Sequence, residues 1–336
     1  MSQAVLKVEN LKTYFKTPSG VVKAVDGIDL VVYEGETVGL VGESGCGKSV
    51  TSLSIMGLLP EPMGYIAGGR ILLDEQDITH LTEKQMRKLR GNDMAMIFQE
   101  PMTSLNPVFT IGQQLSEPLL QHTKLKKKQI RKMIIEMLQL VGIPRADEII
   151  DEYPHQLSGG MRQRVMISLA MLCEPKLLIA DEPTTALDVT IQAQILELMK
   201  DITKQNRMST VLITHDLGVV AEMCDRVTVM YAGQVVESAD VRTLFDEPKH
   251  PYSQGLLDSL PNANDRKQEL RSIKGSVPRP DELPKGCTFA PRCPKVFEKC
   301  LEERPPLFEL ENQSCRCWLY QDEEVESSDS KSLVGS

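Results

Sequence analysis

The sequence contains no long hydrophobic run and no excess of basic residues. None of its apolar stretches approaches the roughly 20 residues that a helix needs to cross a bilayer. Its first residues alternate polar and apolar side chains and include Glu9, so they do not resemble a secretion signal. The formal net charge is −9, which argues against a general nucleic-acid-binding protein, because such proteins carry a basic surface. We therefore expect a cytoplasmic protein that needs other subunits for any role at a membrane.

A cytoplasmic protein is also without the oxidising surroundings in which disulfides persist. The eight cysteines of the chain are therefore expected to be thiols. Five of the eight follow residue 286, and this clustering indicates a metal or a catalytic role rather than disulfide bonds. No internal repeat is present, and a chain of 336 residues is long enough for one large core with an appendage.

A glycine-rich segment, residues 42–49, reads Gly-Glu-Ser-Gly-Cys-Gly-Lys-Ser and fits the phosphate-binding pattern GxxxxGK[ST]. The apolar residues 36–41 before it predict a strand, and residues 48–59 after it predict a helix. In this setting the N–H groups of the loop and of the helix N-terminus converge on phosphate oxygens. Lys48 would reach the β- and γ-phosphates, and the Ser49 hydroxyl would ligate Mg²⁺. The residues of this segment predicted to contact ATP are Gly42, Ser44, Gly45, Cys46, Gly47, Lys48, Ser49 and Val50.

Two acidic residues end another predicted strand. Asp181 and Glu182 follow the apolar residues 176–180, and buried parallel strands present such residues at the carboxyl edge of a sheet. Asp181 suits a Mg²⁺ partner that acts through water, and Glu182 can accept a proton from an attacking water molecule. Alone, the Asp-Glu-Pro sequence could equally cap a strand before a turn. Beside a phosphate loop, we interpret it as catalytic.

Gln99 and His215 each follow a further predicted strand, at residues 93–98 and 210–214. A neutral amide at Gln99 could contact both Mg²⁺ and the attacking water. His215, taken in isolation, is typical of an ordinary histidine at the end of a strand. The two residues are therefore candidates for the nucleotide site because of the motifs that surround them.

A second phosphate site is predicted at residues 157–164, which read Leu-Ser-Gly-Gly-Met-Arg-Gln-Arg. Ser158, Gly159 and Gly160 open a predicted helix, whose first N–H groups favour an anion. One chain that carries two half-sites for one nucleotide is built to close on a partner.

The block between the two phosphate motifs predicts an inserted helical subdomain at about residues 101–165. Within it, residues 126–141 have apolar side chains at helical spacing, namely Ile130, Met133, Ile134, Met137 and Leu138. Polar residues separate these apolar positions, as they do on a helix that packs with one face only.

The composition changes after residue 238, where proline becomes frequent. Just before this point, residues 226–237 predict a hairpin at the edge of the sheet. We expect an ATPase domain at residues 1–240 and a C-terminal extension with a cysteine cluster at residues 241–320. Residues 321–336 are acidic and rich in serine and are predicted to be disordered.

The cysteines of the extension form a candidate metal site. Four of them lie in a proline-rich stretch with little hydrophobic core: Cys287, Cys293, Cys300 and Cys317. Such an element needs a cross-link or a bound metal to be stable. Four thiolates can hold zinc or an iron–sulfur cluster. The spacing lacks the close C-x₂₋₄-C pairs that structural zinc prefers, and Cys315 is an extra candidate. No nucleotide-site motif lies in this segment, so ATP hydrolysis is expected to survive replacement of these cysteines.

The motifs of the chain resemble the ATPase cassette of ABC transporters. The residues that carry the resemblance are, in order, 42–49, Gln99, 157–164, 177–182, 186–188 and His215. It implies an α/β fold: a P-loop NTPase cassette with an inserted α-helical subdomain, an N-terminal antiparallel β-subdomain and a small loop-rich C-terminal extension. It also implies that ATP is hydrolysed with Mg²⁺ in a closed dimer. The residues implied to bind the ATP held by the partner are Ser158, Gly159, Gly160 and Gln163.

The resemblance further implies a role for individual residues. Phe15, rather than Tyr14, lies where the family has an aromatic side chain that stacks on adenine. The other implied roles are general base for Glu182, sensor and Mg²⁺ contact for Gln99, γ-phosphate contact for His215 and communication across the dimer for Asp188.

Residues 43–45, 99–107 and 250–257 are similar to the D-type ATPase subunits of dipeptide and oligopeptide importers. This similarity implies peptide import through two membrane permease subunits, with a second ATPase subunit in a heterodimer and an extracytoplasmic peptide-binding protein. The chain would then lie at the cytoplasmic face of a bacterial or archaeal membrane, without a nucleic-acid partner. A nickel importer of the same branch and a soluble ABC ATPase without a transport role are the alternatives. Residues 286–293 resemble the [4Fe–4S] motif of some of these ATPases, which favours a cluster over zinc.

Cys46 is the one cysteine within the phosphate loop. It lies close to Lys48 at a predicted helix N-terminus, a setting that lowers the pKa of a thiol and raises its reactivity. We therefore expect alkylation of Cys46 to block nucleotide binding and Mg-ATP to protect it. The alternative is a side chain that points into the core and is inert.

Overall fold

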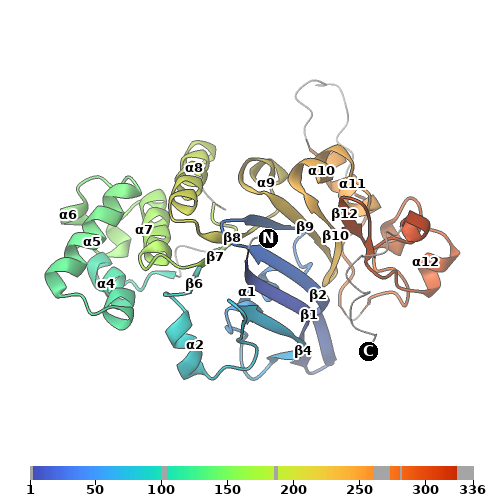
Figure 1. Ribbon diagram of the computed structural model, residues 1–336, viewed down its shortest axis with the longest axis horizontal. Helices are drawn as coiled ribbons and strands as arrows, with labels where there is room; N and C mark the ends of the chain where they lie inside the picture. Colours follow the sequence, from blue (N-terminus) through green and yellow to red (C-terminus); the bar gives the residue numbers. More distant parts are fainter. Residues whose placement is uncertain (1–2, 100–103, 185–187, 261–272, 281, 324–336) are drawn as a thin grey trace, which may run out of the picture.

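The computed structural model describes residues 3–99, 104–184, 188–260, 273–280 and 282–323. Its main sheet lies in the middle of an elongated molecule (Figure 1). On one side of the sheet is a group of helices, the helical end (residues 104–171), and on the other is the C-terminal extension. The two ends therefore flank the sheet that carries the nucleotide motifs.

Five parallel strands form the centre of the main sheet. They are β3 (Thr37–Val41), β6 (Met94–Ile97), β7 (Leu177–Asp181), β8 (Ser209–Thr214) and β9 (Arg226–Tyr231). Their side chains are almost all buried, as expected for parallel strands that helices cover on both faces. The neighbouring pairs in the order β9-β3-β8-β7-β6 all run parallel, so their carboxyl ends share one edge.

The hairpin of β9 and β10 (Gln234–Asp240) was expected at the sheet edge, and this prediction is wrong. Strand β12 (Gln313–Cys315) pairs antiparallel with β10, with Cys315 opposite Glu237, and β11 (Phe308–Glu309) pairs with β12. The C-terminal extension thus completes the main sheet. Such pairing between distant segments leaves no mark in the local pattern of residues 226–237.

The N-terminal strands form a second, antiparallel sheet, which confirms the predicted β-subdomain. It contains β1 (Ala4–Thr17), β2 (Gly20–Tyr33), β4 (Gly64–Leu73) and β5 (Gln76–Asp77) in the order β2-β1-β4-β5. Helix α1 (Lys48–Ile55) follows the phosphate loop but ends before the predicted boundary at residue 59. Gly57 has a φ of 62°, a left-handed conformation that commonly ends helices.

The helical end shares an apolar core with the main sheet, where Ile97 of β6 and Leu178 of β7 lie among its side chains. Its helices are α4 (Ile111–His122), α5 (Lys127–Leu140), α6 (Ala146–Ile149) and α7 (Gly159–Met171). Helix α5 matches the predicted residues 126–141, and its side chains Ile130, Ile134 and Leu138 are all buried in that core. The helical spacing of these residues therefore predicted both the helix and its packed face. The cassette also contains α2 (Glu83–Leu89), α8 (Val189–Gln205) and α9 (Leu217–Met223).

In the described part of the C-terminal extension, the elements besides β11 and β12 are short. Its helices are α10 (Val241–Asp246), α11 (Pro251–Asp258) and α12 (Glu298–Glu302). It packs on the main sheet through Phe289 and Tyr252, whose rings lie 5.2 and 4.7 Å from the ring of Tyr231 in β9. Across the described ranges, the structure has no helix that is both long and apolar enough to span a membrane.

Candidate active site

The phosphate loop connects β3 to α1 and needs glycine at two of its positions. Gly42 has a φ of 154°, and a Cβ atom there would lie 2.3 Å from the Met230 carbonyl oxygen. Gly47 has a φ of 107°, and its Cβ atom would lie 2.8 Å from the Ala24 carbonyl oxygen. In both cases the neighbour is a backbone atom, which cannot move aside as a flexible side chain could. The pattern GxxxxGK[ST] therefore has glycine at these positions for two reasons: the backbone conformation and the lack of room for a Cβ atom. Ser44 and Gly45 form the exposed part of the loop.

Lys48 is buried against its own loop. Its Nζ atom donates hydrogen bonds to the carbonyl oxygens of Gly42, at 2.7 Å, and Glu43, at 3.1 Å. These bonds hold the ammonium group beneath the loop, at the N-terminus of α1. A phosphate placed there would meet both a fixed cation and backbone N–H groups.

Ser49 and Asp181 approach each other from α1 and β7. The Ser49 hydroxyl donates to Asp181 Oδ1 over 3.3 Å. Burial raises the pKa of the Asp181 carboxyl above its ordinary value, and the Ser49 hydrogen bond opposes this shift. A hydroxyl and a carboxylate oxygen at one point form a donor set that Mg²⁺ prefers. The residues present therefore fit the ion.

The Glu182 carboxylate contacts two of the other predicted site residues. Gln99 Nε2 donates to Glu182 Oε2 over 2.8 Å, and His215 Nδ1 lies 3.1 Å from Glu182 Oε1. The Glu182 N–H donates to the Ile213 carbonyl oxygen, and its φ of 47° lies in the left-handed region. Such a conformation is unusual for a residue with a Cβ atom and is concentrated at functional sites. The ends of β6, β7 and β8 thus bring Gln99, Glu182 and His215 together.

The residues of the second predicted phosphate site lie at the start of α7. Ser158 is the N-cap, and its hydroxyl accepts a hydrogen bond from the Met161 N–H over 3.3 Å. A Cβ atom on Gly159 would have no neighbour within 4 Å, so the helix N-terminus is open to a ligand. The predicted helix start is confirmed.

Gln163 and Asp188 differ in how well their positions suit their predicted roles. The Gln163 side chain is buried and donates to the Pro183 carbonyl oxygen, so it links α7 to the segment after Glu182 and does not face outward as an ATP ligand would. Asp188 is exposed at the N-terminus of α8. The neighbouring residues 186–187 of that motif lie outside the described residues.

Two aromatic side chains were considered for adenine. The Tyr14 hydroxyl donates to Asp26 Oδ1 over 2.7 Å, and burial raises the pKa of Tyr14 to about 12. Phe15 packs beside Gly64, where a Cβ atom would lie 2.9 Å from its ring. Tyr14 is therefore held by a polar partner, and Phe15 remains the candidate. Val50, in α1, packs against the core with one side only.

Cys46 does not have the reactive thiol that the sequence predicted. Its side chain is fully buried, and burial raises the pKa of the thiol despite Lys48, whose Nζ atom lies 3.8 Å from Sγ. Loss of water around a thiolate outweighs the nearby cation. Cys46 serves the loop through its backbone, whose N–H donates to the Glu43 carbonyl oxygen.

Comparisons with known proteins agree with this geometry. The family model described as "ABC transporter" matches residues 25–185, and the one described as "Oligopeptide/dipeptide transporter, C-terminal region" matches residues 236–300. The oligopeptide transport ATP-binding protein AppD of Bacillus subtilis (strain 168) is 58% identical over 325 residues, which cover 96% of this chain and 99% of that relative. The chain belongs to the ABC transporter ATPase family.

Two further comparisons support this ABC ATPase assignment. The dipeptide transport ATP-binding protein DppD of Bacillus subtilis (strain 168) is 52% identical, over 96% of this chain and 97% of that relative. Among solved structures, the dimeric ATP-binding cassette MJ0796 with ADP and Pi superposes with a TM-score of 0.63 at 28% identity. The superposition covers 70% of this chain and 99% of the cassette. The predicted α/β cassette fold is confirmed.

In this ABC ATPase the four predicted cluster ligands line one small enclosed cavity of the C-terminal extension. They are Cys287, Cys293, Cys300 and Cys317. Cys315 lies instead in β12, opposite Glu237. Burial raises the pKa of the Cys287 and Cys293 thiols, and that of Cys317 to about 11. Among the residues described, no three His, Cys, Asp or Glu side chains are arranged to hold a metal ion, so the [4Fe–4S] centre is not shown.

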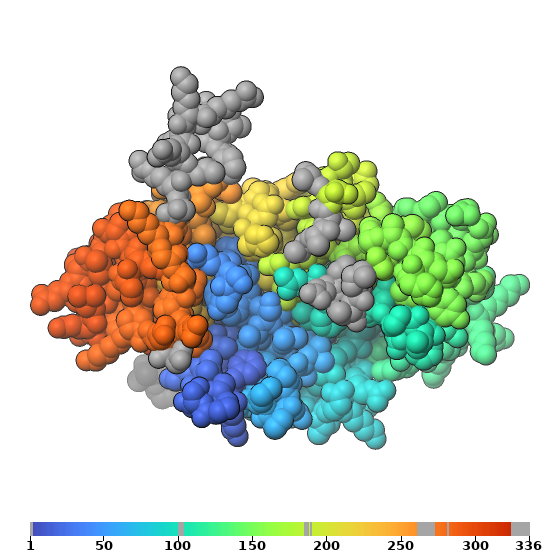
Figure 2. Space-filling view, turned by 180° about the vertical axis from the view of Figure 1, so that it is seen from behind, coloured from blue at the N-terminus to red at the C-terminus, as the bar shows by residue number. Residues whose placement is uncertain are grey.

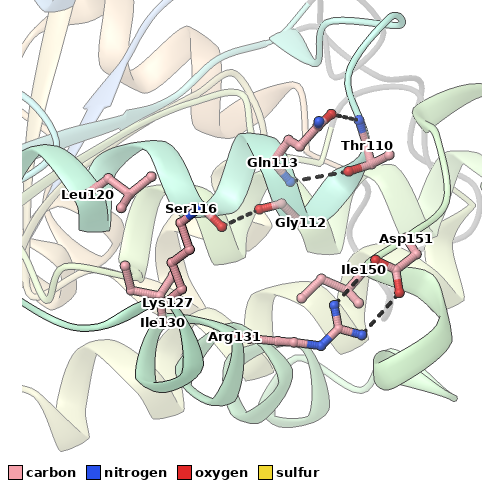
Figure 3. Close-up of a pocket in the computed structure, with 10 residues that line it drawn as sticks. All are labelled: Thr110, Gly112, Gln113, Ser116, Leu120, Lys127, Ile130, Arg131, Ile150 and Asp151. Carbon is pink, nitrogen blue, oxygen red and sulfur yellow. Dashed lines mark hydrogen bonds and ion pairs between the residues drawn. The ribbon is translucent and has the colours of Figure 1, made fainter.

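A second cavity, of about 350 Å³, lies in the helical end (Figure 3). Its walls come from α4, through Ser116 and Leu120, and from α5, through Lys127 and Ile130. At its rim Arg131 points to the carboxylate of Asp151, as Figure 3 shows. The cavity is separate from the nucleotide site.

Sequence reasoning missed the residues that join the extension to the phosphate loop. Arg292 donates two hydrogen bonds to the Glu43 carboxylate, and the Tyr252 hydroxyl accepts one from the Glu43 N–H. The cysteine-rich segment therefore contacts the phosphate loop, although no nucleotide-site motif lies within it. A signal was present in the arginine between Pro291 and Cys293, because a charged residue inside a packed cysteine motif needs a partner.

Proposed function

We propose that this chain hydrolyses ATP to drive import of dipeptides or oligopeptides through partner membrane subunits. The observation that carries the proposal is the convergence of Gln99 and His215 on Glu182, at the sheet edge where the phosphate loop also begins. Peptide cargo is supported by the similarity to AppD and DppD, whose names describe oligopeptide and dipeptide transport.

Hydrolysis assigns a task to each side chain of the site. The loop N–H groups and Lys48 bind the β- and γ-phosphates. Ser49, Asp181 and Gln99 would hold Mg²⁺, which neutralises charge that develops on the phosphates. Glu182 takes the proton of the attacking water at its carboxylate. The bonds from Gln99 and His215 orient that carboxylate before the nucleotide arrives.

The remaining assignments complete the nucleotide site. Phe15 stacks on the adenine, and His215 contacts the γ-phosphate. Support for Phe15 comes from the hydrogen bond that already occupies Tyr14. The ATPase domain, residues 1–240, contains all of these residues.

The site is complete only in a dimer. Ser158, Gly159 and Gly160 would bind the γ-phosphate of the partner's ATP, because the open N-terminus of α7 favours an anion. Asp188 would pass the state of one site to the other. The similar cassette MJ0796 was solved as a dimer with ADP and Pi, which supports this mode. A sister ATPase is the expected partner, in a heterodimer.

The helical end is the surface that we assign to the two permease subunits. Val108 and Phe109, just before α4, expose large apolar side chains. The residues that line the cavity between α4 and α5 begin directly after them, at Thr110. Apolar groups of this kind mark contact surfaces. The chain would then act at the cytoplasmic face of the membrane of a bacterium or archaeon, with an extracytoplasmic peptide-binding protein in the same complex.

Two alternatives for the function were open from the sequence. Nickel import is not favoured, because the relatives described above are named for oligopeptide and dipeptide transport. A soluble ABC ATPase without a transport role is disfavoured by the match of residues 236–300 to the C-terminal region of peptide transporters. Peptide import therefore remains the proposal.

Peptide uptake by cells tests the proposal. Cells that lack the natural copy of the gene would carry the parent chain, Glu182→Gln, or the control Glu34→Gln, whose side chain is exposed far from the site. We expect uptake of a radiolabelled dipeptide with the parent and the control and none with Glu182→Gln. Loss of nickel uptake with unchanged peptide uptake would contradict the proposal.

We also propose that Cys287, Cys293, Cys300 and Cys317 hold a [4Fe–4S] cluster, with zinc as the alternative. The support is that the four thiols line one cavity of a segment with little core of its own. Anaerobically purified protein should be brown and contain about four irons and four sulfides per chain. Colourless protein with one zinc would overturn the cluster in favour of a structural zinc site.

A further inference from the structure

An arginine of the cysteine-rich segment is directed at the phosphate loop. Arg292 lies at the end of a short 3-10 helix, Ala290–Arg292, and its side chain is only 4% exposed. Its two terminal nitrogens donate to the two carboxylate oxygens of Glu43 over 2.7 and 3.0 Å. A bidentate pair of this kind fixes direction as well as distance.

Other bonds fix the arginine itself. Its Nε atom donates to the Lys274 carbonyl oxygen over 3.0 Å, and a terminal nitrogen donates to the Gly275 carbonyl oxygen over 3.2 Å. The ring of Tyr231 lies under the guanidinium, 5.7 Å from its centre. The planar guanidinium therefore has little freedom to follow Glu43 if the loop moves.

Tyr252 provides a second contact with the same loop residue. The Glu43 N–H donates to the Tyr252 hydroxyl over 2.8 Å, and the ring of Tyr252 is fully buried against Phe289 and Tyr231. Both the backbone and the side chain of Glu43 are thus held by the C-terminal extension.

Glu43 in turn holds the rest of the loop. Its carbonyl oxygen accepts hydrogen bonds from Lys48 Nζ and from the Cys46 N–H. A shift of Glu43 would therefore move the lysine that reaches the phosphates and the N–H groups that surround them. Small displacements of such groups weaken the binding of a ligand that needs all of them at once.

We propose that Arg292 is a positioning residue of the ATP site, which holds the phosphate loop through Glu43 from the C-terminal extension. Arg292 touches neither nucleotide nor metal in this role. It sets the affinity for ATP, whereas the carboxylate chemistry at Glu182 remains the same. The proposal needs only the ATPase activity of the family and not the identity of the cargo.

The position of Arg292 also joins the loop to the cysteine cavity. Arg292 directly precedes Cys293, and the Cys293 N–H donates to Ala290 across the same short helix. Replacement of Cys293 should therefore weaken ATP binding through Arg292. This extension of the proposal rests on the four-cysteine centre proposed above.

A double-mutant cycle on the full-length chain tests the proposal. The variants are Arg292→Met, Glu43→Gln and the double variant, and the probe is a fluorescent ATP analogue titrated with Mg²⁺ present. Because a charge-assisted pair is lost, Arg292→Met should weaken binding about tenfold. In the Arg292→Met background, Glu43→Gln should add nothing, because the bond it removes is already absent. The turnover number at saturating ATP should stay within about twofold of the parent, while KM rises with the dissociation constant.

Two further variants separate positioning from folding. Arg292→Lys keeps the charge without the fork and should restore part of the affinity, and Arg242→Met removes an arginine that is 94% exposed in the same extension and should change nothing. If Arg292→Met does not fold, Glu43→Gln alone decides, because it leaves the extension intact and should still weaken binding. Parental affinity in the folded variants, or additive losses in the cycle, would overturn the proposal.

Cys293→Ser distinguishes the two proposals. Weaker ATP binding together with loss of iron supports the connection between the cysteine centre and the loop. If the parent contains no metal and Arg292→Met still weakens binding, the cysteine centre is wrong and the positioning role stands. Unchanged affinity after loss of iron would overturn the connection alone.

Discussion

Two arginine–carboxylate pairs at the two ends of the molecule have similar geometry and different surroundings. In the helical end, Arg131 donates to the two oxygens of Asp151 over 3.3 and 3.0 Å, and in the C-terminal extension Arg292 grips Glu43. The side chains of the first pair are 50% and 69% exposed, those of the second 4% and 33%. Water and salt screen an exposed pair, whereas a buried cation without its partner is costly. The Arg292–Glu43 pair is both largely buried and part of the phosphate loop, whereas the Arg131–Asp151 pair is exposed and lies away from the nucleotide site.

Both ends pack on the main sheet, but at different strands. The helical end shares a core with the sheet, in which Ile134 of α5 and Leu115 of α4 lie with Ile97 of β6. The core of the extension is shared with β9, through Tyr231 and Phe289. Figure 2 shows the ends on opposite sides of the cassette, the extension in orange and the helical end in green. Both ends are therefore packed on the sheet, and the core of the extension includes Val41, which directly precedes the phosphate loop.

The largest effect is expected at the proposed general base. Glu182→Gln should reduce ATP hydrolysis about 10²–10⁴-fold, because the base that activates water is lost. Binding of ATP should be retained, since the phosphate loop is unaltered, and the trapped nucleotide should hold a dimer together. Phosphate release and the molecular mass in solution measure the two effects. Hydrolysis at the parental rate would remove Glu182 from the mechanism.

A pair of core variants should separate the two ends. Phe289→Ala should lower the free energy of unfolding by about 3–5 kcal/mol, and Ile134→Ala by about 2–5 kcal/mol, because each leaves a cavity in a packed core. Only Phe289→Ala should also weaken ATP binding, since Phe289 packs against Tyr252 and lies close to Arg292. Denaturant unfolding and nucleotide titration on the same samples check this. Equal losses of ATP affinity in both variants would contradict the prediction that only the C-terminal extension influences the ATP site.

The sequence was sufficient to predict the helical end and the nucleotide motifs. Their signals are local: a helical repeat in α5, glycines at strained positions in the loop, and acidic residues at the end of β7. Each of these features is determined by residues close together in the chain. The sequence also predicted that Gln99, Glu182 and His215 follow strands. Their convergence in the structure is consistent with this, because the ends of parallel strands meet at one edge.

The extension and the buried groups were harder to predict. The pairing of β12 with β10 and the contact of Arg292 with Glu43 join segments far apart in the chain, and neither leaves a periodic pattern. The prediction of a reactive thiol at Cys46 failed for a different reason. Its neighbours favour a reactive thiol, but burial, which the sequence does not display, determines its pKa.

A smaller effect is expected where the helical end meets the partner's nucleotide. Ser158→Ala removes the N-cap of α7, which should cost about 1 kcal/mol of stability. Hydrolysis should fall further than stability suggests, because the partner's γ-phosphate also loses a ligand. ATP binding to the isolated chain should stay unchanged, unlike in Arg292→Met. The comparison requires ATPase rates over a range of protein concentrations, since the site forms between two chains. Rates independent of concentration in a proven monomer would contradict the dimer mechanism.

The smallest effect is expected for Arg131→Met. Its hydrogen bond to Asp151 lowers the pKa of that carboxyl, so the pair contributes above the ordinary aspartate range and is lost as the pH falls through the lowered pKa. Because both side chains are exposed, thermal unfolding near neutral pH should barely change, and the parent and variant should converge in acid. ATP affinity should equal that of the parent, in contrast to Arg292→Met. A loss of affinity as large as that of Arg292→Met would show that the helical end also positions the phosphate loop. Burial would then not explain the difference between the two arginine–carboxylate pairs.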